Sequence, residues 1–128
     1  MKGQISIEFM IFVTILTVIV TAFLWNNLSL QNRIVGIKTN VEAQKLSDSI
    51  AFEINAAVKA GDGYERNFYV ENNFFGVSNF DISIAEYSVF IDWSDRSVSS
   101  RIITRNITGK VSKGWNKIKN INGEIIVS

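Results

Sequence analysis

The feature that most constrains this chain is an uncharged apolar stretch close to its N-terminus. Between Phe9 and Trp25 the only polar side chains are those of Thr14, Thr17 and Thr21. As a helix this stretch would be about 26 Å long, close to the ~30 Å hydrocarbon core of a bilayer. Threonine hydroxyls can bond carbonyls of their own helix, and Trp25 stands where an interfacial aromatic residue is common. The sequence therefore predicts a membrane-spanning helix.

Three simpler interpretations of this stretch compete. A secretory signal peptide cleaved near Ala22 needs a basic segment before the apolar run, but only Lys2 is basic there and Glu8 stands at the edge of the run. A buried helix of a soluble protein is disfavoured, because a small domain cannot surround so long a helix that is apolar on every side. A plain signal anchor that stays in the membrane is the third interpretation, and it stays open.

Glu8 is an acidic residue at the edge of an apolar run, and its position needs a physical reason. A carboxylate near the middle of a membrane helix costs about 2.5–3.5 kcal/mol, and less near an end. Either the positive N-terminal end of the helix dipole or a buried cation would stabilise it. A cut between Gly3 and Gln4 would create such a cation, an α-amine four residues before Glu8.

The segment Lys2–Phe9 resembles the class III signal peptide of archaeal type IV-like pilins, in which Lys or Arg and Gly precede Q-x-S-x-E and an apolar run. In that family a membrane prepilin peptidase cuts after the glycine, and the apolar segment stays in the mature subunit as its assembly helix. The resemblance implies cleavage between Gly3 and Gln4. It assigns recognition by the peptidase to Lys2, Gly3, Gln4, Ser6 and Glu8.

Filament assembly would move the apolar helix from lipid into contact with copies of itself. Lipid tails are already apolar, so packing and polar pairing must supply the gain. The spacing suggests that the Glu8 carboxylate of one copy meets the Gln4 α-amine of a neighbour, which would fix the axial register of assembly. Cyclisation of an N-terminal Gln would remove that positive charge.

Helical periodicity continues from Asn26 to Ala60. Apolar residues recur in two stripes, from Leu30 to Val41 and from Leu46 to Val58, while charged residues such as Glu53 take the opposite positions. Gly61-Asp62-Gly63 then predicts the end of the helix. The favoured interpretation packs this helix on the chain's own sheet, and a coiled-coil seam is the alternative.

Residues 64–128 predict four to six antiparallel strands. β-branched and aromatic residues alternate with polar ones at 80–84 and 87–94, and a β-rich stretch at 98–108 slips once, which suggests a bulge. Asn122-Gly123 predicts a two-residue hairpin. A sheet of this size is marginal alone, so the helix from about Val41 to Ala60 is expected to cover one face. The expected fold class is α+β, a long N-terminal helix against a small antiparallel sheet.

The expected organisation has four segments. Residues 1–3 are a leader, 4–25 a transmembrane and assembly helix, 26–60 its amphipathic continuation, and 61–128 an antiparallel β head domain. The turn at 61–64 with the strand after it, and the closing segment 120–125, also resemble archaeal pilin head domains. That second resemblance is less specific than the one at the N-terminus.

Composition excludes several kinds of chemistry. The chain has no Cys and no His, which removes disulfides, thiolate metal sites, cysteine nucleophiles and Ser-His-Asp triads. No pair of carboxylates is singled out by spacing, so no catalytic residue, cofactor or metal site is expected and the chain is expected not to be an enzyme. The segment Asp92–Asp95 lacks the ligands of a calcium loop and predicts a turn at a strand end.

Charge is unevenly divided, although the net charge is only +1. Acidic residues dominate 66–95 and basic residues dominate 96–128. Solvent-facing strand positions are the simplest interpretation, and complementarity between neighbouring heads in a filament is a second. Nucleic-acid binding is not expected, because no basic motif interleaved with aromatic residues accompanies the charge.

Two N-glycosylation sequons occur, Asn27-Leu28-Ser29 and Asn106-Ile107-Thr108. Asn106 is the better candidate, since Asn27 lies just past the apolar run and could be covered in a filament core.

The resemblance implies a structural pilin subunit of an archaeal surface filament that serves attachment. The precursor would lie in the cell membrane with a cytoplasmic N-terminus and an extracytoplasmic head, and the mature chain would lie in the extracellular filament. Implied partners are the prepilin peptidase, further copies and other pilins, the membrane platform and ATPase of pilus assembly, and lipid before assembly. A monomeric, membrane-anchored β-rich binding module that does not polymerise is the alternative.

Overall fold

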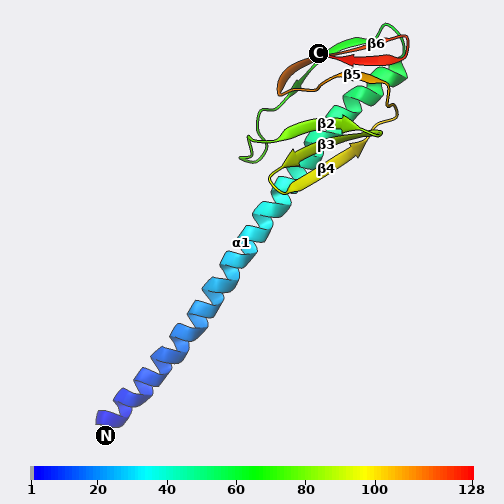
Figure 1. Cartoon of the computed structure of the whole chain (residues 1–128). Coiled ribbons are helices and arrows are strands. Elements are labelled where there is room, and N and C mark those ends of the chain that lie inside the picture. The colour runs from blue at the N-terminus through cyan, green and yellow to red at the C-terminus, as the bar shows by residue number, and fades with distance from the viewer. Residues whose placement is uncertain (1) are drawn as a thin grey trace. The chain divides into compact units, whose positions relative to one another are not determined.

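The computed structural model describes residues 2–128, so Met1 and the side chain of Lys2, both in the expected leader, lie outside the described residues. One helix precedes seven strands, and the predicted α+β class is confirmed (Figure 1). The helix is α1 (Lys2–Ala60), and the strands are β1 (Glu65–Val70), β2 (Asp81–Ala85), β3 (Ser88–Trp93), β4 (Arg96–Arg101), β5 (Ile107–Gly109), β6 (Gly114–Ile121) and β7 (Glu124–Val127).

Contacts divide the chain into an N-terminal unit, residues 1–37, and a C-terminal unit, residues 38–128. The described part of the N-terminal unit is formed by α1 alone, and nearly all of its side chains are exposed. The hydroxyls of Thr14, Thr17 and Thr21 each donate a 2.8 Å hydrogen bond to the carbonyl four residues earlier. The predicted satisfaction of these hydroxyls within the helix is therefore confirmed, and they leave no unpaired donor on the apolar surface.

The C-terminal unit contains two sheets. Strands β2, β3 and β4 form an antiparallel sheet, and a second sheet has the order β1-β6-β7-β5. The pairing of β5 with β7 is parallel, so the expectation of a purely antiparallel head is wrong at this one pair. The chain crosses from the three-stranded sheet after β4, and β5 then lies beside β7 at the edge of the four-stranded sheet.

The predicted single bulged strand at 98–108 is also wrong. Strand β4 ends at Arg101 in one sheet, and β5 begins at Ile107 in the other. Between them Ile102 is buried and its N–H donates to the carbonyl of Tyr87, so contact with the first sheet extends to Ile102 and the chain leaves that sheet after it. The slip in alternation marks a change of sheet rather than a bulge.

Residues 38–60 of α1 supply one face of the core. The buried helix residues are small or branched, and they pack against strand residues such as Val89 and Ile118. The second predicted stripe is confirmed in part, since Ile50, Ile54 and Ala57 are fully or almost fully buried. The first stripe, Leu30 to Val41, is exposed. Cover of a sheet face by the helix is predicted only from about Val41 to Ala60, where Ala43, Ile50 and Ile54 are buried.

The two sheets attach at different levels of this helix segment (Figure 1). The hydroxyl of Ser47 donates to the Val89 carbonyl at 3.0 Å, which holds the three-stranded sheet. Near the helix end, the Asn120 amide donates to the Ala57 carbonyl at 2.9 Å and holds β6 of the four-stranded sheet. These are buried side-chain bonds between elements, and each satisfies a polar group that packing removes from water.

Glu53 corrects the expectation that the charged residues of α1 face solvent. Its side chain is 11% exposed, and the Arg66 guanidinium of β1 lies 3.6 Å from its Oε2 atom. Among the described residues, that oxygen has no hydrogen-bond partner. The buried carboxylate thus depends on one cation from the adjacent strand.

The predicted helix end and hairpin are both confirmed. α1 ends at Ala60, and Gly61 has φ 83°, the left-handed conformation that suits glycine after a helix. Asn122 and Gly123 have φ 52° and 86° and form the two-residue connection between β6 and β7. Positive φ at both positions is what this hairpin type requires.

Candidate functional site

The residues expected to guide processing lie in the first turns of α1. Gln4 and Glu8 are one turn apart and therefore share a side of the helix, whereas Ser6 lies two residues from each and points elsewhere. Glu8 is exposed, and its carboxylate has no hydrogen bond or ion pair among the described residues. The arrangement leaves this carboxylate available to a group from outside the chain.

Gly3 has no packing role in the chain. A Cβ atom built at this residue would meet nothing within 4 Å. The fold therefore does not require glycine here, and any requirement must come from a partner of this segment.

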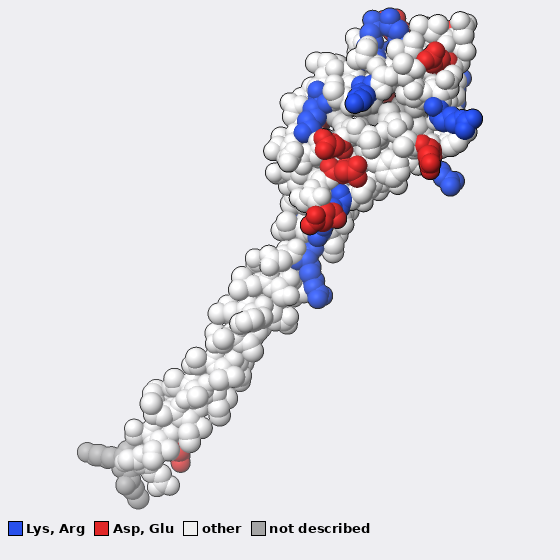
Figure 2. Space-filling model, viewed as in Figure 1, with Lys and Arg blue, Asp and Glu red and all other residues white. Residues whose placement is uncertain are grey.

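The first part of α1 presents a continuous apolar surface. Large apolar side chains from Ile5 to Trp25 are mostly half-exposed or more, and α1 is long and apolar enough to cross a membrane. No charged residue lies between Glu8 and Arg33. Figure 2 shows the same pattern: an acidic group near the N-terminal end of the helix, a long uncharged stretch beyond it, and most Lys, Arg, Asp and Glu at the other end of the chain. A surface of this kind needs lipid or another chain to cover it.

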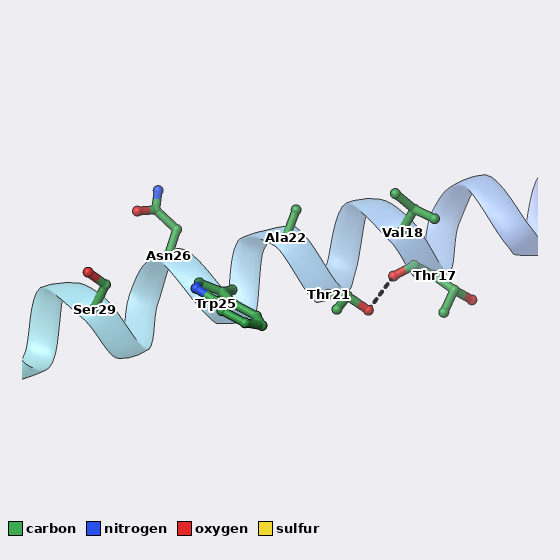
Figure 3. Close-up of a pocket in the computed structure, with 7 residues that line it drawn as sticks. All are labelled: Thr17, Val18, Thr21, Ala22, Trp25, Asn26 and Ser29. Carbon is green, nitrogen blue, oxygen red and sulfur yellow. Dashed lines mark hydrogen bonds between the residues drawn. The ribbon is translucent and has the colours of Figure 1, made fainter.

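A shallow groove runs along one side of α1 at residues 17–29 (Figure 3). Val18, Ala22 and Asn26 project on one side of the view, and Thr21 is bonded to the Thr17 carbonyl. Ala22 has the smallest side chain of the residues that line the groove. Small residues on a membrane helix allow the backbone of a second helix to approach closely.

The two sequon asparagines are both exposed, but they differ in their surroundings. The Asn27 amide donates to the Phe23 carbonyl of its own helix at 2.9 Å. Asn106 lies directly before β5, where its carbonyl accepts from the Ile125 N–H and its amide is 3.4 Å from the Gly123 carbonyl. The backbone at Asn106 is thus fixed while its side chain faces solvent.

The predicted turn at Asp92–Asp95 is confirmed. Trp93 pairs with Arg96, so Ser94 and Asp95 form the connection between β3 and β4. Within residues 2–128, no three Asp or Glu side chains gather into a group that could hold a metal ion. Trp93 is buried in the core, whereas Trp115 on β6 is 73% exposed.

Sequence reasoning missed a cleft beside β1 in the C-terminal unit. Its volume is about 250 Å³, and α1 and the segment that ends β1 form its walls. Tyr69 lines the cleft, and its ring meets that of Trp115 edge-on at 5.4 Å. The alternation of Trp115, Lys117 and Lys119 with buried residues on β6 could have predicted an exposed Trp115, but not its neighbour on another strand.

One ionisable group, the carboxyl of Glu65 at the start of β1, has a shifted pKa. The Lys117 ammonium is hydrogen-bonded to Glu65 and lowers the pKa of that carboxyl below its ordinary value, and Lys119 at 3.6 Å acts in the same direction. The carboxylate lies on the exposed face of β1 between the two lysines.

Comparison with known proteins bears on the N-terminus only. Residues 2–26 match the family model described as Class III signal peptide. No curated protein and no solved structure matches the chain. The matched segment covers the first part of α1, including Gly3, Gln4, Ser6 and Glu8. The chain thus carries a Class III signal peptide on a pilin-like apolar helix, which supports a place among the type IV-like pilins.

Proposed function

We propose that this chain is the precursor of a structural subunit of an archaeal type IV-like surface filament that serves attachment. The observation that carries the proposal is the Class III signal peptide at residues 2–26, which leads directly into an uncharged, exposed helix. The precursor sits in the membrane with its N-terminus in the cytoplasm. A prepilin peptidase then cuts between Gly3 and Gln4.

The exposed apolar surface of α1 supports polymerisation through this helix. In the precursor, lipid covers the side chains from Ile5 to Trp25, and in the filament the helices of other copies cover them. The groove beside Ala22 gives a second helix room to approach. The membrane platform and ATPase of pilus assembly would drive the transfer from lipid to filament, with other pilins as further subunits.

Glu8 is proposed to set the register of assembly by pairing with the Gln4 α-amine of a neighbouring copy. Its carboxylate has no partner among the described residues, which leaves it available for this contact. Glu8→Gln removes the charge and keeps the shape. Normal filament yield and geometry in this variant would refute the pairing.

The mass of the N-terminal peptide from native cells tests the proposed function. A mature chain that starts at Gln4, open or cyclised, supports it. A start at Met1 or Lys2 contradicts it and favours the membrane-anchored binding module that does not polymerise. A start near Phe23 would indicate an ordinary secreted β-rich domain.

An extracytoplasmic C-terminal unit would also expose Asn106 to glycosylation. Both sequon amides donate to a backbone carbonyl, but the Asn106 bond is the longer, at 3.4 Å against 2.9 Å for Asn27, and its position outside the helix supports this modification. Asn106→Gln should remove the glycan mass from the intact protein. An unchanged mass would show that this sequon is not used.

A further inference from the structure

We propose that the C-terminal unit carries its own head-to-tail contact, separate from the apolar helix. The loop 101–105 of one copy docks into the cleft beside Tyr69 of the next copy. This inference rests on the proposed function, because it requires that copies of the chain assemble: the loop 101–105 and the cleft beside Tyr69 each bind another copy.

The cleft offers an apolar floor and an acidic rim. Leu46 of α1 and Phe74 line it as apolar surfaces, and Tyr69 adds an aromatic wall. Two acidic residues, Glu42 and Glu71, and one basic residue, Lys45, also line the cleft, so its charged residues leave one net negative charge. Glu42 already pairs with Lys45 at 2.7 Å, whereas the Glu71 carboxylate has no ion pair among the described residues. The cleft therefore suits a side chain that is cationic at its tip and apolar along its stem.

The loop 101–105 presents the complementary groups. Ile103 is 53% exposed, and Arg101 and Arg105 flank it with exposed side chains. Within residues 2–128, neither guanidinium has a hydrogen bond or ion pair. An exposed isoleucine between two free arginines is a compact basic and apolar knob.

This knob is held in place before any partner arrives. Asn55 of α1 donates to the Arg101 carbonyl at 3.3 Å and accepts from the Ile103 N–H at 2.9 Å. Ile102, between them, is buried. A loop fixed in this way loses little conformational entropy when it docks.

The chemistry of the two surfaces matches. Arginine forms paired hydrogen bonds with carboxylates and stacks on aromatic rings, so Arg105 or Arg101 suits both Glu71 and Tyr69. Ile103 would then cover the apolar floor. Trp115, exposed beside Tyr69, would form the edge of the same contact, as large aromatic residues often do at interfaces.

The cleft and the knob lie on different flanks of the C-terminal unit. The cleft is lined by helix positions 42, 45, 46 and 49. Hydrogen bonds to Ser100 of β4 come from positions 44 and 48, and the bond to the loop comes from position 55. At about 100° per residue, the two sets point roughly 130° apart around α1. One copy can therefore use both surfaces at once. A contact between two different patches is heterologous, and it extends into an open polymer unless its rotation closes a ring.

The absence of cysteine from the natural chain allows a direct test by crosslinking. The double variant Ser49→Cys/Ile103→Cys, produced in cells that process the wild-type chain, places one thiol in the cleft and one on the knob. Oxidised filaments should give a ladder of dimers, trimers and larger species on a non-reducing gel. The matched control is Ser49→Cys/Lys110→Cys, whose second thiol is exposed but outside the knob. The ladder should exceed the control at least about tenfold, and a ladder no stronger than the control would overturn the proposal.

Charge reversal supplies an independent test. Arg105→Glu and Glu71→Arg should each lower filament yield on the order of tenfold, which corresponds to the loss of one modest ion-pair contact. Because every copy carries both surfaces, the combined variant restores opposite charges and should recover the yield. Lys110→Glu is the control for a change of net charge. The proposed contact would be refuted if the single variants gave the same filament yield as Lys110→Glu. It would also be refuted if the combined variant did not recover the yield.

The N-terminal mass of each variant separates this inference from the proposed function. If the wild-type chain is cut at Gln4 and forms filaments while the knob and cleft variants behave as controls, only the head-to-tail contact fails. If the wild-type chain is neither cut nor polymeric, the proposed function itself fails.

Discussion

Ile19 and Ile54 lie on the same helix, yet Ile19 is 59% exposed and Ile54 is fully buried. The N-terminal unit keeps its apolar side chains outside, where lipid or other chains must cover them. The C-terminal unit packs the same residue type against two sheets. Substitutions in the N-terminal unit should therefore affect contacts with lipid or other chains, whereas substitutions in the C-terminal unit should affect the stability of the fold.

Polar residues show the same difference. Thr17 and Asn27 bond carbonyls of their own helix and would keep these bonds in lipid. Ser47 and Asn120 bond carbonyls of other elements and lose their partners if the fold opens. Hydrogen bonds in the N-terminal unit are therefore local, and those in the C-terminal unit hold the tertiary structure.

The largest contrast is expected for two glycines. Gly3→Val should abolish cleavage after residue 3 and leave the C-terminal unit unchanged, because a side chain at Gly3 meets nothing in the chain. Gly109→Ala should leave cleavage after residue 3 unchanged and should destabilise the C-terminal unit. Gly109 has φ 97°, and a Cβ there would clash with the Val127 carbonyl, so the loss of stability should exceed about 1 kcal/mol.

Mass spectrometry of the N-terminal peptide and thermal unfolding of the full-length protein measure both effects. Cleavage at the normal site in Gly3→Val would remove the proposed role of this glycine. An unchanged melting temperature in Gly109→Ala would show that the β5–β7 pair can shift without cost.

The next contrast is between the two isoleucines. Ile54→Ala should lower the free energy of unfolding of the C-terminal unit by about 2–5 kcal/mol, because it leaves a cavity in the core. Ile19→Ala should leave that free energy unchanged. Chemical denaturation of the full-length protein in detergent, followed by tryptophan fluorescence, compares the two. Equal losses would mean that the apolar helix also stabilises the C-terminal unit.

A smaller contrast is expected for two asparagines. The buried Asn120 donates to Ala57 at 2.9 Å and accepts from the Gly123 N–H at 3.0 Å. Asn120→Ala leaves these backbone groups without partners and should cost about 1–3 kcal/mol. Asn27→Ala removes only an exposed bond within the helix, so the same unfolding measurement should show almost no change. A loss of unfolding free energy well below about 1 kcal/mol in Asn120→Ala would indicate that water replaces the lost hydrogen bonds.

The smallest effect is on pH dependence, and it is confined to the C-terminal unit. Lys117 lowers the folded pKa of Glu65 below its ordinary value of 4.5. The stability from this pair is therefore present above that value and is lost as pH falls through the folded pKa. Glu65→Gln should show a shallower loss of stability than the wild type below about pH 4.5 in unfolding measurements. If the stability of Glu65→Gln and of the wild type fell identically with pH, the exposed Glu65–Lys117 pair would contribute nothing to stability.

Much of the fold could be predicted where neighbouring residues decide it. The end of α1 at Gly61, the hairpin at Asn122-Gly123 and the turn at Ser94-Asp95 follow from local turn chemistry. The threonine bonds within α1 follow from helix geometry alone. The signal-peptide segment was predictable for the same reason, because it is a short contiguous motif that the family model matches at residues 2–26.

Predictions failed where distant segments decide the outcome. Alternation at 98–108 is compatible with one bulged strand, but the chain passes from one sheet to the other between Arg101 and Ile107. The helix pattern places Glu53 among charged residues, but β1 packs over it and supplies Arg66. The slip in alternation at 98–108 fits both a bulge and a change of sheet, and nothing in the local sequence shows that Glu53 is buried.

The sequence by itself determined the membrane-compatible helix, its signal segment and the positions of the turns, since periodicity, charge and turn residues act over a few neighbours. Only the tertiary structure decided the parallel β5–β7 pair, the burial of Glu53, and the cleft and knob of the C-terminal unit. These features depend on which strands meet and in which register. That choice is made by the packing of the whole core against α1, so no single segment encodes it.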